Sequence, residues 1–79
     1  MNYTPEEITL ATEFANKLDD HDSMHFHLSS VRLYEEWSLR EQLQKTLKKP
    51  AHKIRVSRGA YYNSLVQRHG IPKDTRSEH

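Results

Sequence analysis

Residues 22–34 restrict the fold of this chain more than any other segment. Placed on a helix at about 100° per residue, the segment carries apolar side chains on two nearly opposite sides. One side holds Met24, Leu28 and Val31, and the other holds Phe26 and Leu33. A helix that is apolar on two sides must be covered on two sides. The segment therefore predicts the central helix of an all-α protein.

The length of the chain and its lack of cysteine narrow the class of protein further. Seventy-nine residues build one small domain with a modest core and a thin margin of stability. Without cysteine, a disulfide framework, a thiol nucleophile and a cysteine zinc site are excluded. The N-terminus lacks the regions of a signal peptide, and no apolar run is long enough to span a membrane. We therefore expect a cytoplasmic protein.

Start and stop signals place the helices of a predicted four-helix bundle. Thr4 and Glu7 are spaced as a capping box, with Pro5 between them at the first helical position. Gly70 follows the last apolar residues of the fourth helix, where a left-handed glycine commonly ends a helix. The expected helices are residues 5–18, 23–34, 36–49 and 58–69.

The segments outside the helices complete this prediction. In residues 50–57, Ile54 and Val56 alternate with polar residues, but there is no second strand to pair with them. We expect an extended loop that places both side chains under the bundle. Residues 1–71 are predicted to form a single helical domain. Residues 72–79 lack apolar anchors and are predicted to be a mobile, disordered tail.

Histidines and carboxylates gather in residues 20–27, but their spacing does not predict a metal site. His21 precedes the predicted helix, and His27 points about 160° away from His25. A closed zinc site needs about four converging ligands, so we expect these histidines to be exposed or partly buried, without metal. The chain also lacks a glycine-rich phosphate loop and a nucleophile elbow. We predict a non-enzymatic protein with no catalytic residues and no cofactor.

Charge divides the chain into an acidic half and a basic half. Residues 1–39 hold two basic and eight acidic residues, a net charge of −6, whereas residues 40–79 hold ten and three, a net charge of +7. Such asymmetry suggests an anionic partner for the basic half. The candidate phosphate contacts are Lys45, Lys48, Lys49, Lys53, Arg55 and Arg58, and the candidate base contacts are Asn63 and Gln67. Gly59, beside Arg58 at a helix start, would let a phosphate approach the backbone. The alternative is that the two halves attract each other, or that the charges are only solvated.

Trp37 supports a different function, in which the chain binds another protein or a second copy of itself. It lies at the edge of the leucine stripe of the third helix, where a partly exposed tryptophan is a typical interface anchor. The alternative is that Trp37 covers one end of the core. A non-enzymatic protein-interaction or adaptor module is the first functional prediction, and a nucleic-acid-binding module is the second.

Residues 53–66, with the sequence KIRVSRGAYYNSLV, resemble an element of small helical modules in plasmid and phage replication proteins. In those modules an isoleucine and a basic residue precede a Gly-Ala-Tyr helix start, and an apolar pair follows. Some short uncharacterised bacterial proteins are similar over a longer span, which includes a helix like residues 31–47. The resemblance implies a mobile-element or DNA-replication context and specifies no catalytic residue. The 79 residues hold no larger replication domain.

Overall fold

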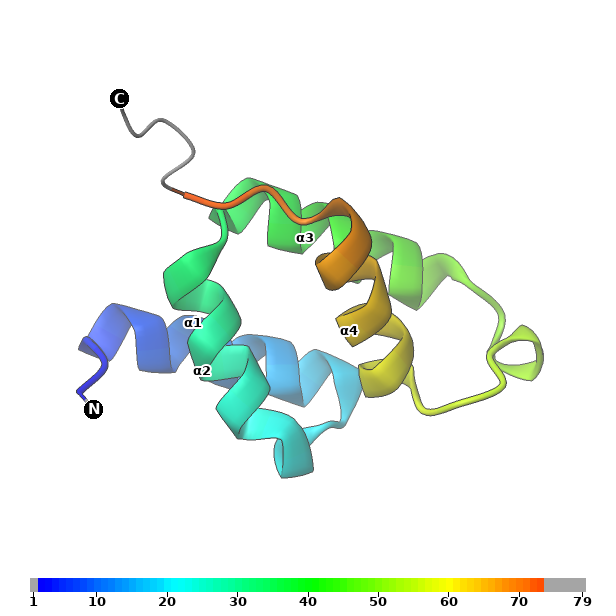
Figure 1. The fold of residues 1–79 in the computed structure, drawn as a ribbon. Helices are drawn as coiled ribbons and strands as arrows, with labels where there is room; N and C mark the ends of the chain where they lie inside the picture. Colours follow the sequence, from blue (N-terminus) through cyan, green and yellow to red (C-terminus); the bar gives the residue numbers. More distant parts are fainter. Residues whose placement is uncertain (1, 74–79) are drawn as a thin grey trace.

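The computed structural model describes residues 2–73, which form four α-helices and two short 3-10 turns (Figure 1). The helices are α1 (Pro5–Leu18), α2 (Met24–Leu33), α3 (Glu36–Lys48) and α4 (Arg58–His69). The 3-10 turns are η1 (His21–Ser23) and η2 (Ala51–Lys53). The predicted all-α four-helix fold is confirmed, and each helix end lies within one residue of its expected position. None of these helices has the length and apolar character needed to cross a membrane.

Local interactions at the start of α1 agree with the sequence. The Thr4 hydroxyl accepts from the Glu7 backbone N–H at 3.1 Å, and the Glu7 carboxylate accepts from the Thr4 N–H at 2.8 Å. This reciprocal pair satisfies two donors that the first helical turn leaves free. The helix therefore begins at Pro5, as predicted.

The left-handed residue lies at a different helix end from the one predicted. Asp19 ends α1 with a φ of 52°, and the next residue, Asp20, donates its N–H to the Ala15 carbonyl. Gly70 instead has a φ of −63° and a ψ of 142°, which is extended backbone, so the prediction for Gly70 was wrong. The chain after Gly70 has to run straight along residues 33–35, and an extended conformation permits this.

The core lies where all four helices meet, and Tyr62 of α4 is its largest fully buried side chain. The Tyr62 ring packs against Phe14 of α1 at a centroid distance of 5.9 Å. It also packs against Phe26 and His27 of α2, at 6.2 and 5.8 Å. The other buried members of this cluster are Ala11, Leu18, Val31, Leu39, Leu43 and Val66. Tyr62 therefore connects α4 to both helices of the first half of the chain.

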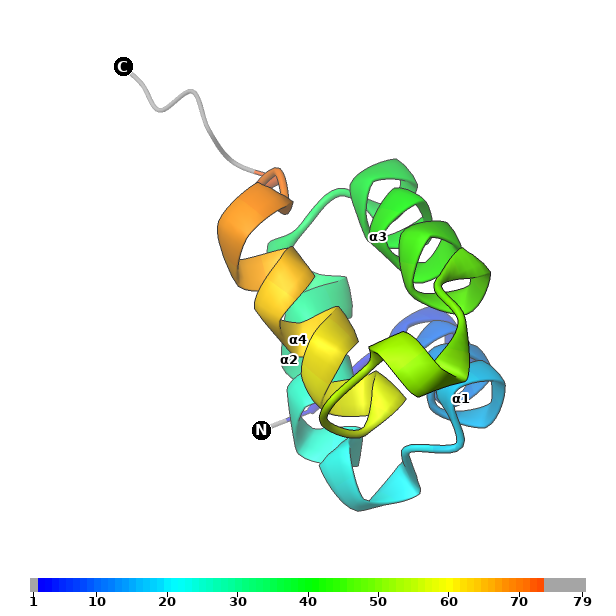
Figure 2. The ribbon, with the colours of Figure 1, turned by 90° about the vertical axis from the view of Figure 1, so that its right-hand side faces the viewer.

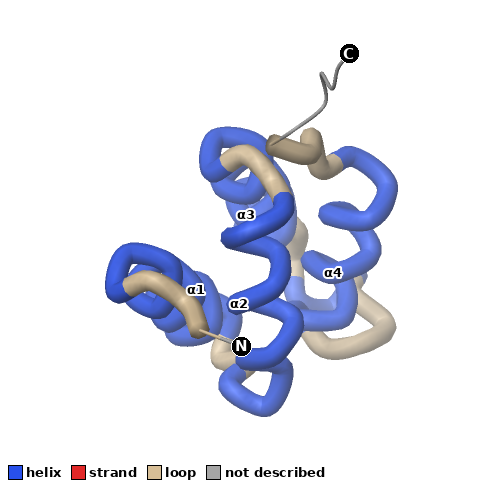
Figure 3. The backbone as a smooth tube through the Cα atoms, turned by 60° about the vertical axis from the view of Figure 1, so that its left-hand side comes forward, coloured by secondary structure: helices blue, strands red, loops and turns tan. Residues whose placement is uncertain are grey.

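The second helix lies between α1 and α4 (Figure 3), as expected for a helix covered on two sides. Val31 is buried, and Phe26 and Leu28 are partly buried against the core. Leu33, however, is 59% exposed, so its predicted burial was wrong. His27, on the opposite side of α2, is fully buried, which corrects its predicted exposure. His27 belongs to the stripe of Met24, Leu28 and Val31 at i, i+3, i+4 and i+7, a signal that could have revealed its burial.

Residues 71–73 run antiparallel to residues 33–35 at the end of the chain that the structure describes (Figure 1). The Glu35 N–H donates to the Ile71 carbonyl at 2.8 Å, and the Lys73 N–H donates to the Leu33 carbonyl at 2.9 Å. The Ile71 N–H donates to the buried Ser38 hydroxyl at 2.9 Å. The folded part therefore extends to Lys73, and residues 74–79 of the predicted tail lie outside the described residues.

The loop between α3 and α4 projects beyond the end of α3 (Figures 1 and 2). Ile54 is half-buried as expected, but Val56 is 58% exposed, so its predicted burial was wrong. The 3-10 turn η2 carries the chain outward after Pro50, to a place that no helix covers. The loop therefore presents its charged side chains together with one exposed valine.

Candidate functional site

Six cations lie on consecutive segments at one end of the molecule, and we call this region the basic end. The segments are the last turn of α3, η2, the following loop and the first residue of α4, which come forward together in Figure 2. The six residues are Lys45, Lys48, Lys49, Lys53, Arg55 and Arg58. Lys49 and Arg58 are half-buried, and the other four are exposed. Folding therefore leaves these cations exposed or half-buried at one end of the molecule.

Within residues 2–73, ion pairs form only at cations outside the basic end. Within residues 2–73, none of its six cations forms an ion pair with a carboxylate. By contrast, Arg32 binds Glu7 at 2.8 Å, and Arg40 binds Glu13 at 2.8 Å. Glu7 and Glu13 are thus held by arginines outside the basic end.

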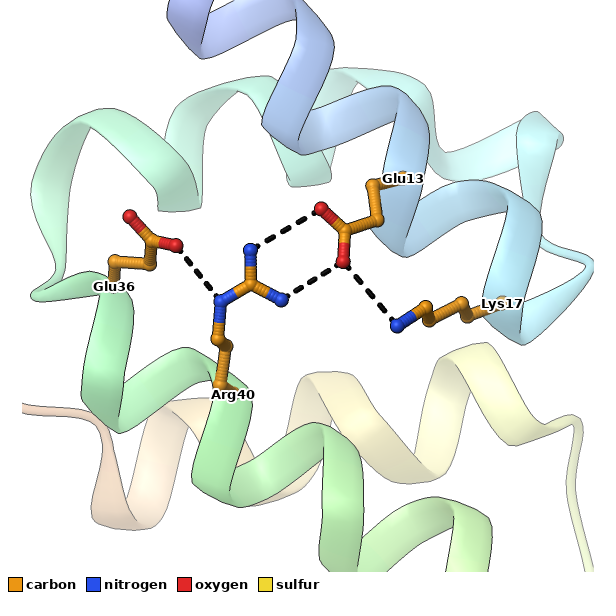
Figure 4. A network of polar contacts seen from close by, with 4 residues as sticks. All are labelled: Glu13, Lys17, Glu36 and Arg40. Atoms are coloured by element: carbon orange, nitrogen blue, oxygen red, sulfur yellow. Dashed lines mark hydrogen bonds and ion pairs between the residues drawn. The ribbon is translucent and has the colours of Figure 1, made fainter.

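The Arg40 network joins α1 to α3 (Figure 4). The Arg40 guanidinium donates two hydrogen bonds to the Glu13 carboxylate and one to Glu36, while Lys17 lies 3.3 Å from Glu13. The Arg40 hydrogen bonds lower the pKa of Glu13 to about 2, and the Arg32 hydrogen bond lowers the pKa of Glu7 to about 2. Both carboxylates are therefore ionised at neutral pH and held by arginine.

These pairs also determine the character of a groove between α1 and α3. The groove has a volume of about 520 Å³ and lies between α1 and α3. Its carboxylates belong to Glu6, Glu7, Glu13 and Glu36, and the last three are bound to Arg32 or Arg40. Among the residues that the structure places, no group of three His, Asp or Glu side chains could hold a metal ion. The groove is therefore a neutralised contact between helices.

The beginning of α4 is not available to a phosphate in the way the sequence suggested. Gly59 is buried, and a Cβ at this position would overlap the Asp20 carboxylate. The Asp20 carboxylate of the chain itself thus occupies the space beside the Gly59 backbone. A carboxylate is favoured there because the backbone N–H groups and the dipole of a helix start are positive. The expected phosphate approach at Gly59 was wrong, although Arg58 beside it carries no ion pair within residues 2–73.

The two candidate base contacts lie away from the lysines of α3. The Gln67 side-chain amide donates to Asn63, and Gln67 lines a shallow groove between α2 and α4. Lys49 lies on the other side of α4, with its Nζ 5.4 Å from the Tyr61 ring centroid. Tyr61 and Asn63 are about 160° apart on a helix. The structure therefore gathers the cations at one end and separates Asn63 and Gln67 from Lys49.

A buried Asp–His pair holds the α1–α2 turn against α4. His27 Nε2 lies 3.1 Å from Asp20 Oδ2, and because a carboxylate only accepts, Nε2 carries the proton. Nδ1 of His27 is buried with no partner among the described residues, as is the Tyr62 hydroxyl. Burial lowers the pKa of His27, and this effect exceeds the opposing effect of Asp20. His27 is therefore neutral in the folded protein at neutral pH.

This pair predicts a loss of stability as the pH falls below the ordinary histidine value of 6.5. His27 of the unfolded chain then binds a proton that folded His27 does not bind. The free energy of unfolding therefore falls by at most about 1.4 kcal/mol per pH unit. The lowered pKa values of Glu7 and Glu13 affect stability in a separate pH range, between 4.5 and about 2. Urea unfolding at several pH values between about 5 and 7.5 should show this dependence in the wild type but not in His27→Gln. Exposed His25, changed to Gln, is the control, and an unchanged slope in His27→Gln would contradict the assignment.

Trp37 is the second candidate, and its exposure excludes one of its two interpretations. It lies in the first turn of α3 and is 59% exposed, so it does not cover the end of the core. Leu33 at the end of α2 and Ile71 after α4 are also exposed large apolar residues. The Glu35 N–H donates to the Ile71 carbonyl, and the Ile71 N–H donates to the Ser38 hydroxyl, which brings these segments together. We call Leu33, Trp37 and Ile71 the apolar corner.

The fold and these two surfaces define a small all-α protein with an unpaired basic end and an apolar corner. No protein-family model, curated protein or solved structure matches the chain. The resemblance of residues 53–66 to replication modules therefore stays a prediction from the sequence. In the structure these residues contain the exposed loop and the first turns of α4, which include half of the basic end.

Proposed function

We propose that this protein is a non-enzymatic nucleic-acid-binding module that contacts phosphates through its basic end. One observation supports this function above all. The six cations of the basic end form no ion pair within residues 2–73 and lie on consecutive segments, whereas Lys17, Arg32 and Arg40 are paired and the two other unpaired cations, Arg68 and Lys73, lie outside this region. Clustered, uncompensated Lys and Arg on one region are the electrostatic footprint of phosphate binding.

The arrangement favours binding without sequence preference. Phosphate contacts position a protein on nucleic acid but carry no sequence information. The side chains that could read bases, Asn63 and Gln67, bond to each other and face the α2 side of α4. With six phosphate contacts, the logarithm of the binding constant should fall with the logarithm of salt concentration with a slope of about −5 on duplex DNA. The basic end should therefore bind duplexes of different sequence with similar affinity.

Fluorescence anisotropy with labelled duplex and single-stranded oligonucleotides tests this function, with salt varied between about 50 and 200 mM. Changing both Lys48 and Arg55 to Gln should weaken binding to every sequence and reduce the salt slope by about two, because each lost contact releases one counterion fewer. Lys17→Gln is the matched control, since Lys17 is already paired with Glu13. Absence of binding at low salt, or equal binding by the double variant, would exclude the function.

The exposure of Trp37 favours protein binding as a second candidate function. Trp37 lies in the first turn of α3, and Lys48 is its last residue. At about 1.5 Å per residue, the helix separates the two surfaces by roughly 17 Å. A partner at the apolar corner would therefore leave the basic end free, which is consistent with an adaptor that binds protein and nucleic acid together.

A further inference from the structure

The apolar corner consists of exposed apolar residues from three segments whose backbones are held next to one another. Leu33 and Trp37 are each 59% exposed, and Ile71 is 40% exposed. Their backbones are held by the antiparallel pairing of residues 33–35 with 71–73 and by the bond from Ile71 to Ser38. Because the backbone is bonded on both sides, the corner offers a preorganised surface, which lowers the entropy cost of binding.

Two carboxylates lie close to Trp37 in the sequence, whereas Lys73, whose N–H bonds to the Leu33 carbonyl, lines the groove between α1 and α3. Glu35 precedes Trp37 by two residues, and Glu41 follows it by one helical turn. Neither takes part in an ion pair within the described part of the chain, whereas Glu36 is held by Arg40. Glu41 is exposed and Glu35 is half-buried. An apolar patch beside two free carboxylates is complementary to a partner that combines apolar and basic side chains.

The Trp37 ring also lacks the cation that other aromatic rings of this protein have. Arg32 lies 4.3 Å from the Tyr3 ring centroid, Arg40 lies 5.5 Å from that of Phe14, and Lys49 covers Tyr61. No such contact involves Trp37 within residues 2–73, although tryptophan is the best cation–π acceptor. A Lys or Arg of a partner could occupy this face and reach Glu41 as well.

A groove between α2 and α4 shares one residue, Leu33, with the apolar corner. It has a volume of about 460 Å³. Phe26 and Tyr34 provide further apolar lining, and Ser29, Ser30 and Gln67 provide the polar lining. A groove of this kind is suited to the apolar side of a helix, whose anchors recur at i, i+3, i+4 and i+7.

We propose that the apolar corner and the adjoining groove bind a basic amphipathic helix of a partner protein. The apolar side of that helix would cover Leu33, Trp37 and Ile71. Its Lys and Arg side chains would pair with Glu35 and Glu41 and stack on Trp37. This inference rests on the protein-binding function and specifies the chemistry of the partner.

Trp37 is the only tryptophan of the chain, so its fluorescence reports directly on this surface. The probe is a synthetic amphipathic peptide of leucine and lysine in a helical repeat, and the comparison peptide replaces every lysine with glutamate. The leucine–lysine peptide should shift the Trp37 emission to shorter wavelength, and the leucine–glutamate peptide should not. With labelled leucine–lysine peptide, Trp37→Ala should weaken binding at least about tenfold. Changing both Glu35 and Glu41 to Gln should weaken it about three- to tenfold.

Glu6→Gln is the matched control, because Glu6 is an exposed acid of α1 and should leave the affinity unchanged. Equal binding of both peptides, or no effect of the Glu35 and Glu41 changes, would overturn the basic partner while leaving protein binding in place. Should neither peptide bind, and light scattering show the same monomer for wild type and Trp37→Ala, both the basic partner and protein binding would be overturned.

Discussion

Changing Tyr62 to Ala is expected to lower the free energy of unfolding by about 3–5 kcal/mol. Its ring is fully buried and lies within 6.2 Å, centroid to centroid, of the rings of Phe14, Phe26 and His27. Removal of the ring would leave a cavity between three helices that have no nearby side chain able to fill it. For a domain of this size the loss is a large part of the total stability, and much of the population should unfold at room temperature.

The matched variant Tyr62→Phe should behave differently. The Tyr62 hydroxyl is buried without a hydrogen-bond partner among the described residues, and burial raises its pKa. Removing an unsatisfied buried group is neutral or stabilising, by up to about 1 kcal/mol. Urea unfolding followed by circular dichroism measures both variants. If Tyr62→Phe were as destabilising as Tyr62→Ala, the packing explanation would fail, because the ring would not be the part that matters.

Changing Gly59 to Ala should destabilise the protein by about 2 kcal/mol, although alanine is the better helix former. The added Cβ would overlap the Asp20 carboxylate. Asp20 has little freedom to move, because its Oδ2 bonds to buried His27 and its backbone N–H bonds to the Ala15 carbonyl. The new methyl group therefore has to displace either the α1–α2 turn or the beginning of α4.

The effect of Gly59→Ala on the free energy of unfolding should change sign once the Asp20 carboxylate is removed. In an Asp20→Ala background the overlap disappears, and Gly59→Ala should stabilise the helix by up to about 1 kcal/mol. A double-mutant cycle from thermal or urea unfolding measures the coupling between the two positions directly. A stabilising Gly59→Ala in the wild type would show that the Asp20 side chain does not occupy this position in solution.

The Asp20–Gly59 contact also connects stability to the proposed function. Asp20, His27 and Gly59 hold the beginning of α4, where Arg58 emerges. At the beginning of α3, far from the basic end, the Ser38 hydroxyl accepts from the Ile71 N–H and so supports the apolar corner. Each proposed surface is thus built on one end of the α3–α4 pair and supported by a buried polar group. This arrangement is consistent with an adaptor whose two surfaces are kept apart by α3.

The helix ends show what the sequence by itself determined. The Thr4–Glu7 capping box and the Ser57 hydroxyl, which accepts from the Ala60 N–H at 3.1 Å, both join residues three apart. Such interactions depend only on local backbone geometry, so their residue types can be recognised in the chain. The all-α class could be predicted for the same reason. The six cations lie on consecutive segments, so their position near one another in the chain was also visible in the sequence.

Only the tertiary structure decided how distant segments meet. Asp20 lies against Gly59, thirty-nine positions later in the chain, and so takes the place that the sequence offered to a phosphate. Tyr62 packs on His27 from thirty-five positions later in the chain, and Trp37, which could have covered one end of the core, is 59% exposed. Local patterns do not specify these contacts, because each depends on the angle at which two helices cross and on which side chains then compete for the same space.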